Sequence, residues 1–140
     1  MDFDKCREIK KDKIITVQEN KRIYSIQNQS RVEISKIIVD GCLIEDNKEK
    51  CDFLFEINSI SEVHYVELKG ADIQKAYNQI VATVTACKDE HKIFSSKRGF
   101  IVASRVPKAG PQVQVLKKKM LKVCSTQLFV ATNRHTEKIS

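Results

Sequence analysis

The sequence predicts an α/β fold in which helices flank a mixed central β-sheet, with the elements in the order β-β-β-α-β-α-β. Three observations indicate this class. Residues 51–69 alternate like a β-hairpin, residues 71–90 carry apolar side chains at helical spacing, and residues 99–106 form a nearly continuous apolar run. A helix between two strands is typical of a crossover, so we expect the strand at 99–106 to lie parallel to its neighbour.

The length of 140 residues predicts one domain over residues 1–140, to which the charged segment 1–30 contributes the weakest pattern. Residues 13–17 and 22–26 alternate like short strands. A helix over 4–13 is an open alternative, although its two apolar residues are too few to define a buried face.

Residues 32–44 are rich in β-formers and are broken by Asp40 and Gly41, which indicates a bulge or bend. The wholly polar segment 45–50 predicts the chain reversal that follows. Folding the chain back at about residue 47 sets Asp40 opposite Leu54, give or take one or two residues. Asp40 then either shares the face of Asp52, as an additional metal ligand, or only shapes the bend.

The hairpin 51–69 brings charged residues to one strand end. If the hairpin turns near residue 60, the residue numbers of two antiparallel partners add up to about 120. Asp52 then lies opposite the strand end formed by Glu67, Leu68 and Lys69. Glu67 and Lys69 share a face, while Leu68 points into the core and offers its carbonyl outward. Two carboxylates and a carbonyl suit a hard cation such as Mg²⁺ or Mn²⁺. The alternative is a solvated strand end without a metal.

Asp52, the Glu67-Leu68-Lys69 motif and the glycine and helix directly after it resemble the PD-(D/E)xK nuclease superfamily, over about residues 36–105. The resemblance implies a restriction endonuclease-like core and a Mg²⁺- or Mn²⁺-dependent endonuclease that hydrolyses phosphodiester bonds in DNA. It also implies that Asp52, Glu67 and the Leu68 carbonyl bind the metal and that Lys69 acts in catalysis. The family's first core helix is not evident, so the position of a third acid is open.

Residues 71–90 form the predicted crossover helix, with Asp72 in its first turn. In the resembled superfamily, a glutamine or lysine of this helix often faces the site. Gln79 is the candidate catalytic residue here, and Gln74 is the alternative. One nuclease branch has a tyrosine after the glutamine, whereas Tyr77 precedes it in this chain, so the branch stays undetermined.

The C-terminal part predicts a buried strand at 99–106, ended by Pro107 and Gly110, then a helix at 113–123 with one apolar side. A final strand is expected at 127–132, followed by an exposed, frayed tail.

The formal net charge of +7 and the pI of about 9.2 suit a polyanionic partner, for which DNA is the expectation and RNA the alternative. The basic residues expected to bind nucleic acid are Lys97, Arg98, Arg105, Lys117, Lys118, Lys119 and Lys122. The other interpretation of the lysine run is a solvated helix face.

Five scattered cysteines without a CxxC pair predict reduced thiols in the cytoplasm and disfavour zinc. The N-terminus is too charged for a signal peptide, and no apolar run is long enough to cross a membrane. The small chain leaves no room for a recognition domain, so we expect a homodimer. Junction-resolvase-like, restriction and defence nucleases all fit. The alternatives are a catalytically inactive nucleic-acid-binding or assembly subunit and an unrelated small α/β protein.

Overall fold

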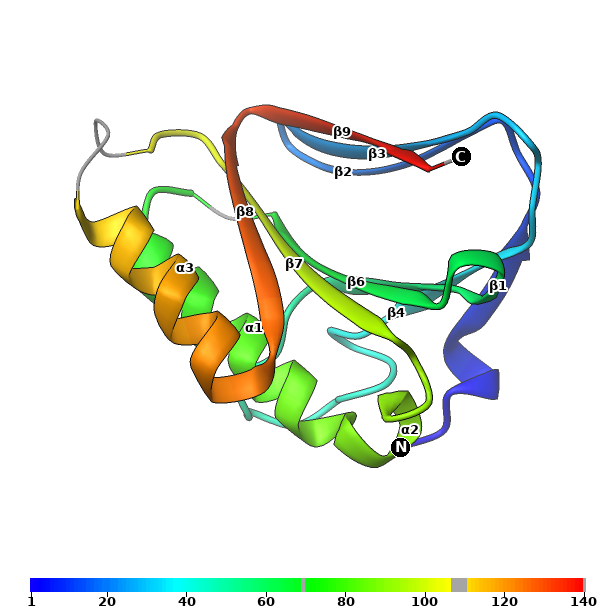
Figure 1. The fold of residues 1–140 in the computed structure, drawn as a ribbon, viewed down its shortest axis with the longest axis horizontal. Helices are drawn as coiled ribbons and strands as arrows, with labels where there is room; N and C mark the ends of the chain where they lie inside the picture. The colour runs from blue at the N-terminus through cyan, green and yellow to red at the C-terminus, as the bar shows by residue number, and fades with distance from the viewer. Residues whose placement is uncertain (69, 107–110, 140) are drawn as a thin grey trace.

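The computed structural model describes residues 1–68, 70–106 and 111–139, so the predictions that concern Lys69, Pro107 and Gly110 lie outside the described residues. A central sheet is covered on one face by the helices α1 (Ile73–Ala86) and α3 (Pro111–Cys124), and on the other face by a second, smaller sheet (Figure 1). The short elements η1 (Asp4–Cys6), η2 (Asn58–Ile60) and α2 (Lys88–His91) lie at the connections.

The central sheet has the strand order β1-β4-β5-β6-β7-β8 and is mixed. The pairs from β1 to β6 are antiparallel, and β6, β7 and β8 run parallel to one another. The α/β class, with helices against a mixed sheet, is confirmed. The strands are β1 (Arg7–Lys10), β4 (Ile34–Ile38), β5 (Phe53–Ile57), β6 (Glu62–Leu68), β7 (Ser96–Ala103) and β8 (Thr126–Thr132).

The β5–β6 hairpin has the register that its alternation predicts. Phe53 pairs with Val66 and Leu54 with Tyr65, which places Asp52 at the level of Glu67. The backbone agrees, because the Asp52 N–H donates to the Val66 carbonyl at 3.1 Å.

The register predicted for Asp40 is wrong. Leu54 pairs with Ile37, because β4 ends at Ile38 and the chain then turns back on itself. In this turn the Ile44 N–H donates to the Val39 carbonyl at 2.9 Å, and Gly41 has a φ of 86°, a value that favours glycine. The apolar residues after Gly41 fold into the helix-side core and do not extend the strand.

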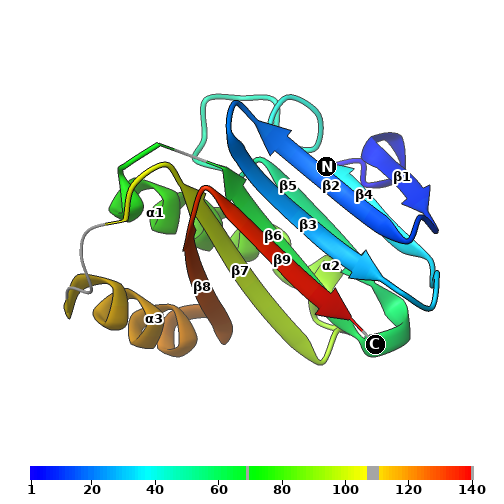
Figure 2. The ribbon, with the colours of Figure 1, turned by 90° about the horizontal axis from the view of Figure 1, so that it is seen from above.

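A second sheet of order β2-β3-β9 lies over the central one (Figure 2). It consists of β2 (Ile14–Glu19), β3 (Arg22–Asn28) and β9 (Arg134–Ile139), and β9 runs parallel to β3. The two short N-terminal strands are confirmed. The frayed tail is wrong, since β9 forms there, and the alternative helix over 4–13 is wrong, since most of that segment is η1 and β1.

Two apolar cores fill the spaces between the layers. The helix-side core includes Tyr65 and Ile80, and the core under the second sheet includes Tyr24 and Phe100. Gly99 of β7 allows both helices to approach the sheet, because a Cβ there would lie 3.2 Å from Ile80 and 3.3 Å from the Met120 sulfur. A larger residue at this position would require the Ile80 and Met120 side chains to shift.

The prediction of five reduced cysteines is wrong for one pair. Cys6 and Cys42 form a disulfide with a Cα–Cα distance of 5.8 Å, because η1 and the turn at Gly41 bring together two residues that lie 36 positions apart. Cys51 and Cys87 are free and buried, and Cys124 is free and half-buried. Among the helices of the described residues, none has the length and apolar character needed to cross a membrane.

Candidate functional site

The two carboxylates singled out by the sequence lie side by side at one end of the central sheet. Asp52 directly precedes β5, and its Oδ2 accepts a hydrogen bond from the Leu68 N–H at 2.8 Å. Glu67, on the neighbouring strand β6, is fully buried. The side chain of Asp52 is therefore tied to the backbone directly after Glu67, and this bond keeps the two acids at one level. Lys69, the third predicted residue, lies outside the described residues.

Helix α1 brings Gln79 to this pair. With its amide turned so that both groups are satisfied, the Gln79 nitrogen donates to Glu67 Oε2 at 3.1 Å and to the Lys75 carbonyl at 3.3 Å. Gln74 is exposed and instead donates to Asn78 at 3.1 Å. Of the two glutamines considered, Gln79 is thus the one in contact with Glu67.

Asp40 does not join the acids in the same way. Its backbone N–H donates to the Asp52 carbonyl at 3.3 Å, but its carboxylate is 58% exposed and lies 3.9 Å from the Lys50 ammonium. The structure therefore places Asp40 in the bend, and the expectation of an additional ligand there gains no support from its contacts.

The two acids would offer a metal ion oxygen ligands, which hard cations prefer. Among the described residues, no cluster of three or more His, Cys, Asp or Glu side chains is placed to hold a metal ion. Asp52 and Glu67 would supply two carboxylates, a number that suits Mg²⁺ or Mn²⁺, because these ions keep several water or phosphate ligands. These donor types match such an ion, but Glu67 is fully buried, so metal binding here stays a prediction.

The neighbouring thiol does not belong to this chemistry. Burial raises the pKa of Cys51 well above its usual value, and the nearby Glu67 and Asp52 carboxylates raise it further. Burial likewise raises the pKa of Cys87, to about 12. Both thiols stay protonated near neutral pH, which argues against a thiolate ligand or nucleophile.

The basic residues expected to bind nucleic acid fall into separate groups. Lys97 and Arg98 lie at the start of β7, at the far end of the sheet from Asp52. Arg98 also pairs with Glu137 at 2.9 Å and with Glu62 at 3.4 Å, so its charge is already compensated.

Arg105 is the basic residue at the same sheet end as the acids. It is exposed and follows Ser104, whose N–H donates to the Gly70 carbonyl at 3.1 Å, just beyond the end of β6. On α3, Lys118, Lys119 and Lys122 are exposed, and Lys117 is half-buried. The Lys119 ammonium lies 5.8 Å from the ring centre of Tyr77 on α1.

Two buried Tyr–His–Glu chains escaped the sequence analysis. The Tyr65 hydroxyl bonds to His91 Nδ1 at 2.5 Å, and His91 Nε2 bonds to Glu56 at 2.7 Å. On the opposite face, Tyr24 bonds to His64 and His64 to Glu62, each at 2.8 Å. Glu56 and His64, polar residues within the apolar strands β5 and β6, were the available signal.

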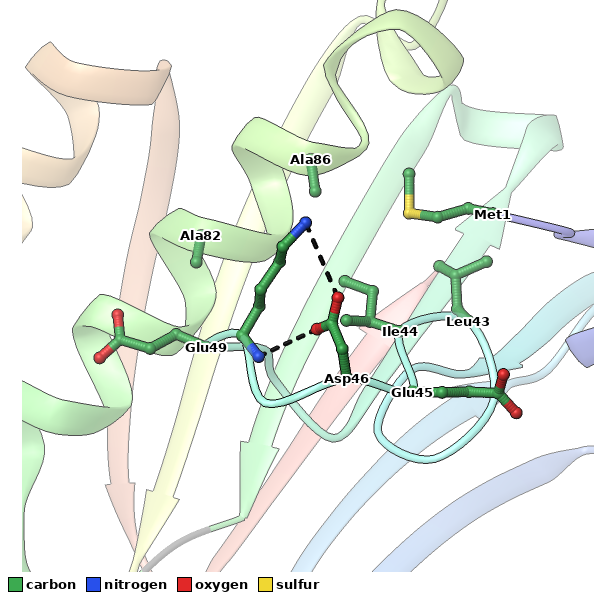
Figure 3. A pocket seen from close by; sticks show the side chains of 9 residues that line it. Met1, Leu43, Ile44, Glu45, Asp46, Glu49, Ala82 and Ala86 are labelled. Atoms are coloured by element: carbon green, nitrogen blue, oxygen red, sulfur yellow. Dashed lines mark hydrogen bonds and ion pairs between the residues drawn. The ribbon is translucent and has the colours of Figure 1, made fainter.

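The pocket drawn in Figure 3 lies away from the acids. It has a volume of about 570 Å³, with Leu43 and Ile44 on one side and Ala82 and Ala86 of α1 on the other. Its lining includes Glu45, Asp46 and Glu49, together with Lys48, whose ammonium lies 3.7 Å from Asp46. The excess of carboxylates disfavours a polyanion, so this pocket is not the candidate site.

Comparison of the chain with protein-family models, with curated proteins and with solved structures finds no match.

Proposed function

We propose that this protein is a metal-dependent endonuclease that hydrolyses phosphodiester bonds in DNA. One observation carries the proposal: Asp52 and Glu67 meet at one sheet end, the first held by the Leu68 amide and the second by Gln79. Lys69 follows directly in the sequence. Asp52, Glu67 and Lys69 thus follow one another in the sequence order that the PD-(D/E)xK resemblance implies.

The topology supports a restriction endonuclease-like core. The strands β4, β5 and β6 form an antiparallel meander, α1 crosses over, and β7 lies parallel to β6. The chain differs from the expected pattern at its N-terminus. In the described residues before β4 the only helical element is the three-residue η1, and strands occupy the place of a first core helix.

In the proposed mechanism, Asp52, Glu67 and the Leu68 carbonyl would hold Mg²⁺ or Mn²⁺. Such an ion, when bound, activates a water molecule and neutralises phosphate charge. Gln79 orients Glu67 by donating to one carboxylate oxygen, and the Leu68 N–H orients Asp52. Lys69 would place a positive charge beside the scissile phosphate and stabilise the charge that develops there.

The proposed substrate is DNA, bound by a homodimer. The net charge of +7 attracts a polyanion, and the exposed Arg105, Lys118, Lys119 and Lys122 are placed to contact phosphates. A second copy of the chain would double the surface that contacts DNA.

A second candidate function is a catalytically inactive nucleic-acid-binding or assembly subunit with the same fold. The full burial of Glu67 favours this alternative, because a metal needs direct access to the carboxylate. A subunit of this kind would bind DNA but would not cleave it, whichever divalent metal ion is present.

The test is cleavage of supercoiled plasmid and of synthetic branched DNA with Mg²⁺, Mn²⁺, Ca²⁺ or EDTA. We expect cleavage with Mg²⁺ or Mn²⁺ alone. Lys69→Ala should abolish cleavage and retain Mn²⁺ binding, since an ammonium is not a metal ligand. Lys75→Ala, at an exposed position of α1, is the matched control and should keep full activity. Undiminished turnover by folded Lys69→Ala protein would remove the assignment, and DNA binding without cleavage would favour the inactive subunit.

A further inference from the structure

One side chain of α1 reaches the backbone beside Asp52. Thr83 is fully buried, and its hydroxyl oxygen accepts a hydrogen bond from the Cys51 N–H at 2.8 Å. The same hydroxyl donates to the Gln79 carbonyl at 2.9 Å. Thr83 therefore contacts the chain one residue before Asp52 and, one helical turn away, the residue that binds Glu67.

This arrangement connects both acids to a single turn of helix. Gln79 donates to the Glu67 side chain, and Thr83 accepts from the strand that carries Asp52. Since Gln79 and Thr83 are four residues apart, they lie on the same face of α1. A movement of α1 relative to the sheet would thus displace both carboxylates together.

The local chemistry of Thr83 argues for a role beyond helix formation. A β-branched residue is a weak helix former, and a hydroxyl that bonds the carbonyl four residues back slightly destabilises a helix. The buried Cys51 N–H, however, needs an acceptor, because a buried donor without one is costly. The Thr83 hydroxyl, which slightly destabilises α1, is therefore the acceptor that the buried Cys51 N–H needs.

We propose that Thr83 is a positioning residue for the metal site, which acts by fixing the backbone at Asp52. The inference rests on the proposed function, because it concerns the geometry of the same two acids. Thr83 does not touch the metal or the substrate. Its hydroxyl fixes the backbone at Cys51, one residue before Asp52, which the hairpin register sets at the level of Glu67.

The test compares Thr83→Val, which removes the hydroxyl at nearly constant volume, with Thr83→Ser, which retains it. Mn²⁺ affinity is measured by titration calorimetry without DNA, and the Mg²⁺ concentration for half-maximal cleavage is measured separately. We expect Thr83→Val to weaken Mn²⁺ binding about tenfold, the equivalent of about one buried hydrogen bond. Thr83→Ser should bind Mn²⁺ like the wild type. Thr83→Ala serves as a second variant if Thr83→Val does not fold.

Thr126→Val is the matched control for a lost buried hydroxyl. Thr126 is fully buried, and its hydroxyl donates to the Cys124 carbonyl at 2.9 Å, at the start of β8 and far from the acids. This variant should lower the melting temperature without changing Mn²⁺ affinity. A merely structural role for Thr83 would give the same result.

The outcomes separate this inference from the function it rests on. Equal Mn²⁺ affinity of wild type and folded Thr83→Val protein, with an active wild type, overturns the positioning role alone. Equal losses in Thr83→Val and Thr83→Ser also overturn it, because the hydroxyl would then not be the cause. A wild type that neither binds Mn²⁺ nor cleaves DNA overturns the proposed function together with this inference.

Discussion

At the scale of single residues, the buried polar groups are arranged as hydrogen-bonded chains. Glu56 accepts from His91 Nε2 at 2.7 Å and from Arg7 at 2.7 Å, and Arg7 continues to Asp4 at the surface. A carboxylate only accepts, so His91 Nε2 donates in this contact, and Nδ1 of the same ring bonds to the Tyr65 hydroxyl. These hydrogen bonds give partners to polar atoms whose burial in the core would otherwise cost free energy.

Glu56 should make the stability of the protein depend on acid pH. Burial opposes the charged form, but hydrogen bonds from His91 and Arg7 outweigh it and hold the pKa of Glu56 below its usual 4.5. A lowered native pKa contributes stability above the unfolded-state value, and this contribution is lost as the pH falls through the native pKa. We therefore expect the unfolding free energy of the wild type to fall as the pH drops below about 5.

Glu56→Gln tests this dependence in urea unfolding followed by circular dichroism. The variant should lose about 1–3 kcal/mol at neutral pH, the usual range for hydrogen bonds to a charged group, and should show a flatter acid limb. Glu8→Gln on β1, where the side chain is exposed, is the control and should follow the wild type. If the unfolding free energy of Glu56→Gln falls as steeply at acid pH as that of the wild type, Glu56 is not the cause of the pH dependence.

The sequence predicted the two acids of the site but not Thr83, which bonds to the backbone beside Asp52. The pairing of Asp52 with Glu67 follows from alternation and the position of one turn, both of which are local properties. Gln79 came from the family resemblance. Thr83 was not predicted, because its contact with Cys51 depends on which azimuth of α1 meets the sheet, and the periodicity of a helix does not contain that information.

At the scale of elements, the sequence analysis missed the last strand of the second sheet, β9. The β9 segment reads Arg-His-Thr-Glu-Lys-Ile and has one apolar residue, so its alternation resembles an exposed tail. Ile139 is nevertheless buried in the core under the second sheet, and β9 pairs with β3, which lies more than a hundred residues earlier in the chain. A strand specified by so distant a partner leaves little local signal. β4 to β8 were predictable because each neighbours the next element in sequence.

Ile139→Ala measures whether β9 is an integral part of the fold. Removing a buried isoleucine side chain should lower the unfolding free energy by about 2–4 kcal/mol, as large-to-small changes in a core do. Lys138→Ala, at the adjacent exposed position, should change it by less than about 0.5 kcal/mol. Urea unfolding at constant pH gives both values. Equal stability of the two variants would show that β9 contributes little.

At the scale of the whole molecule, both outer layers expose basic side chains, but only on α3 do they follow one another in a run. Arg98 pairs with Glu137 at 2.9 Å at the second sheet, whereas α3 exposes Lys118, Lys119 and Lys122. Exposed lysines add little to stability, so a functional role for this layer has to come from a partner. The helix layer is therefore the surface on which DNA binding is tested.

Lys118→Glu combined with Lys119→Glu should weaken DNA binding and flatten its salt dependence. Each phosphate contact that is lost removes nearly one unit from the slope of log affinity against log salt, so we expect a decrease of about one to two units. Fluorescence anisotropy with a labelled duplex in Ca²⁺ measures the slope. Lys21→Glu with Lys138→Glu, which reverses the same charge on the second sheet, is the matched control. An unchanged slope in the α3 variant would assign this helix to solvation and move the DNA contacts to Arg105 and Lys97.

During synthesis, β2 and β3 leave the ribosome long before their last partner exists. Asn28 pairs with Ile139, so the second sheet stays incomplete until the segment that carries Ile139 has been translated. At about 5–20 residues per second, the interval between these residues is on the order of ten seconds. In that time the aromatic ring of Tyr24, which in the finished protein lies 4.9 Å from that of Phe100, belongs to a layer that is still open at one edge. The nascent chain thus presents an apolar, partly paired sheet to the chaperones that meet it as it emerges.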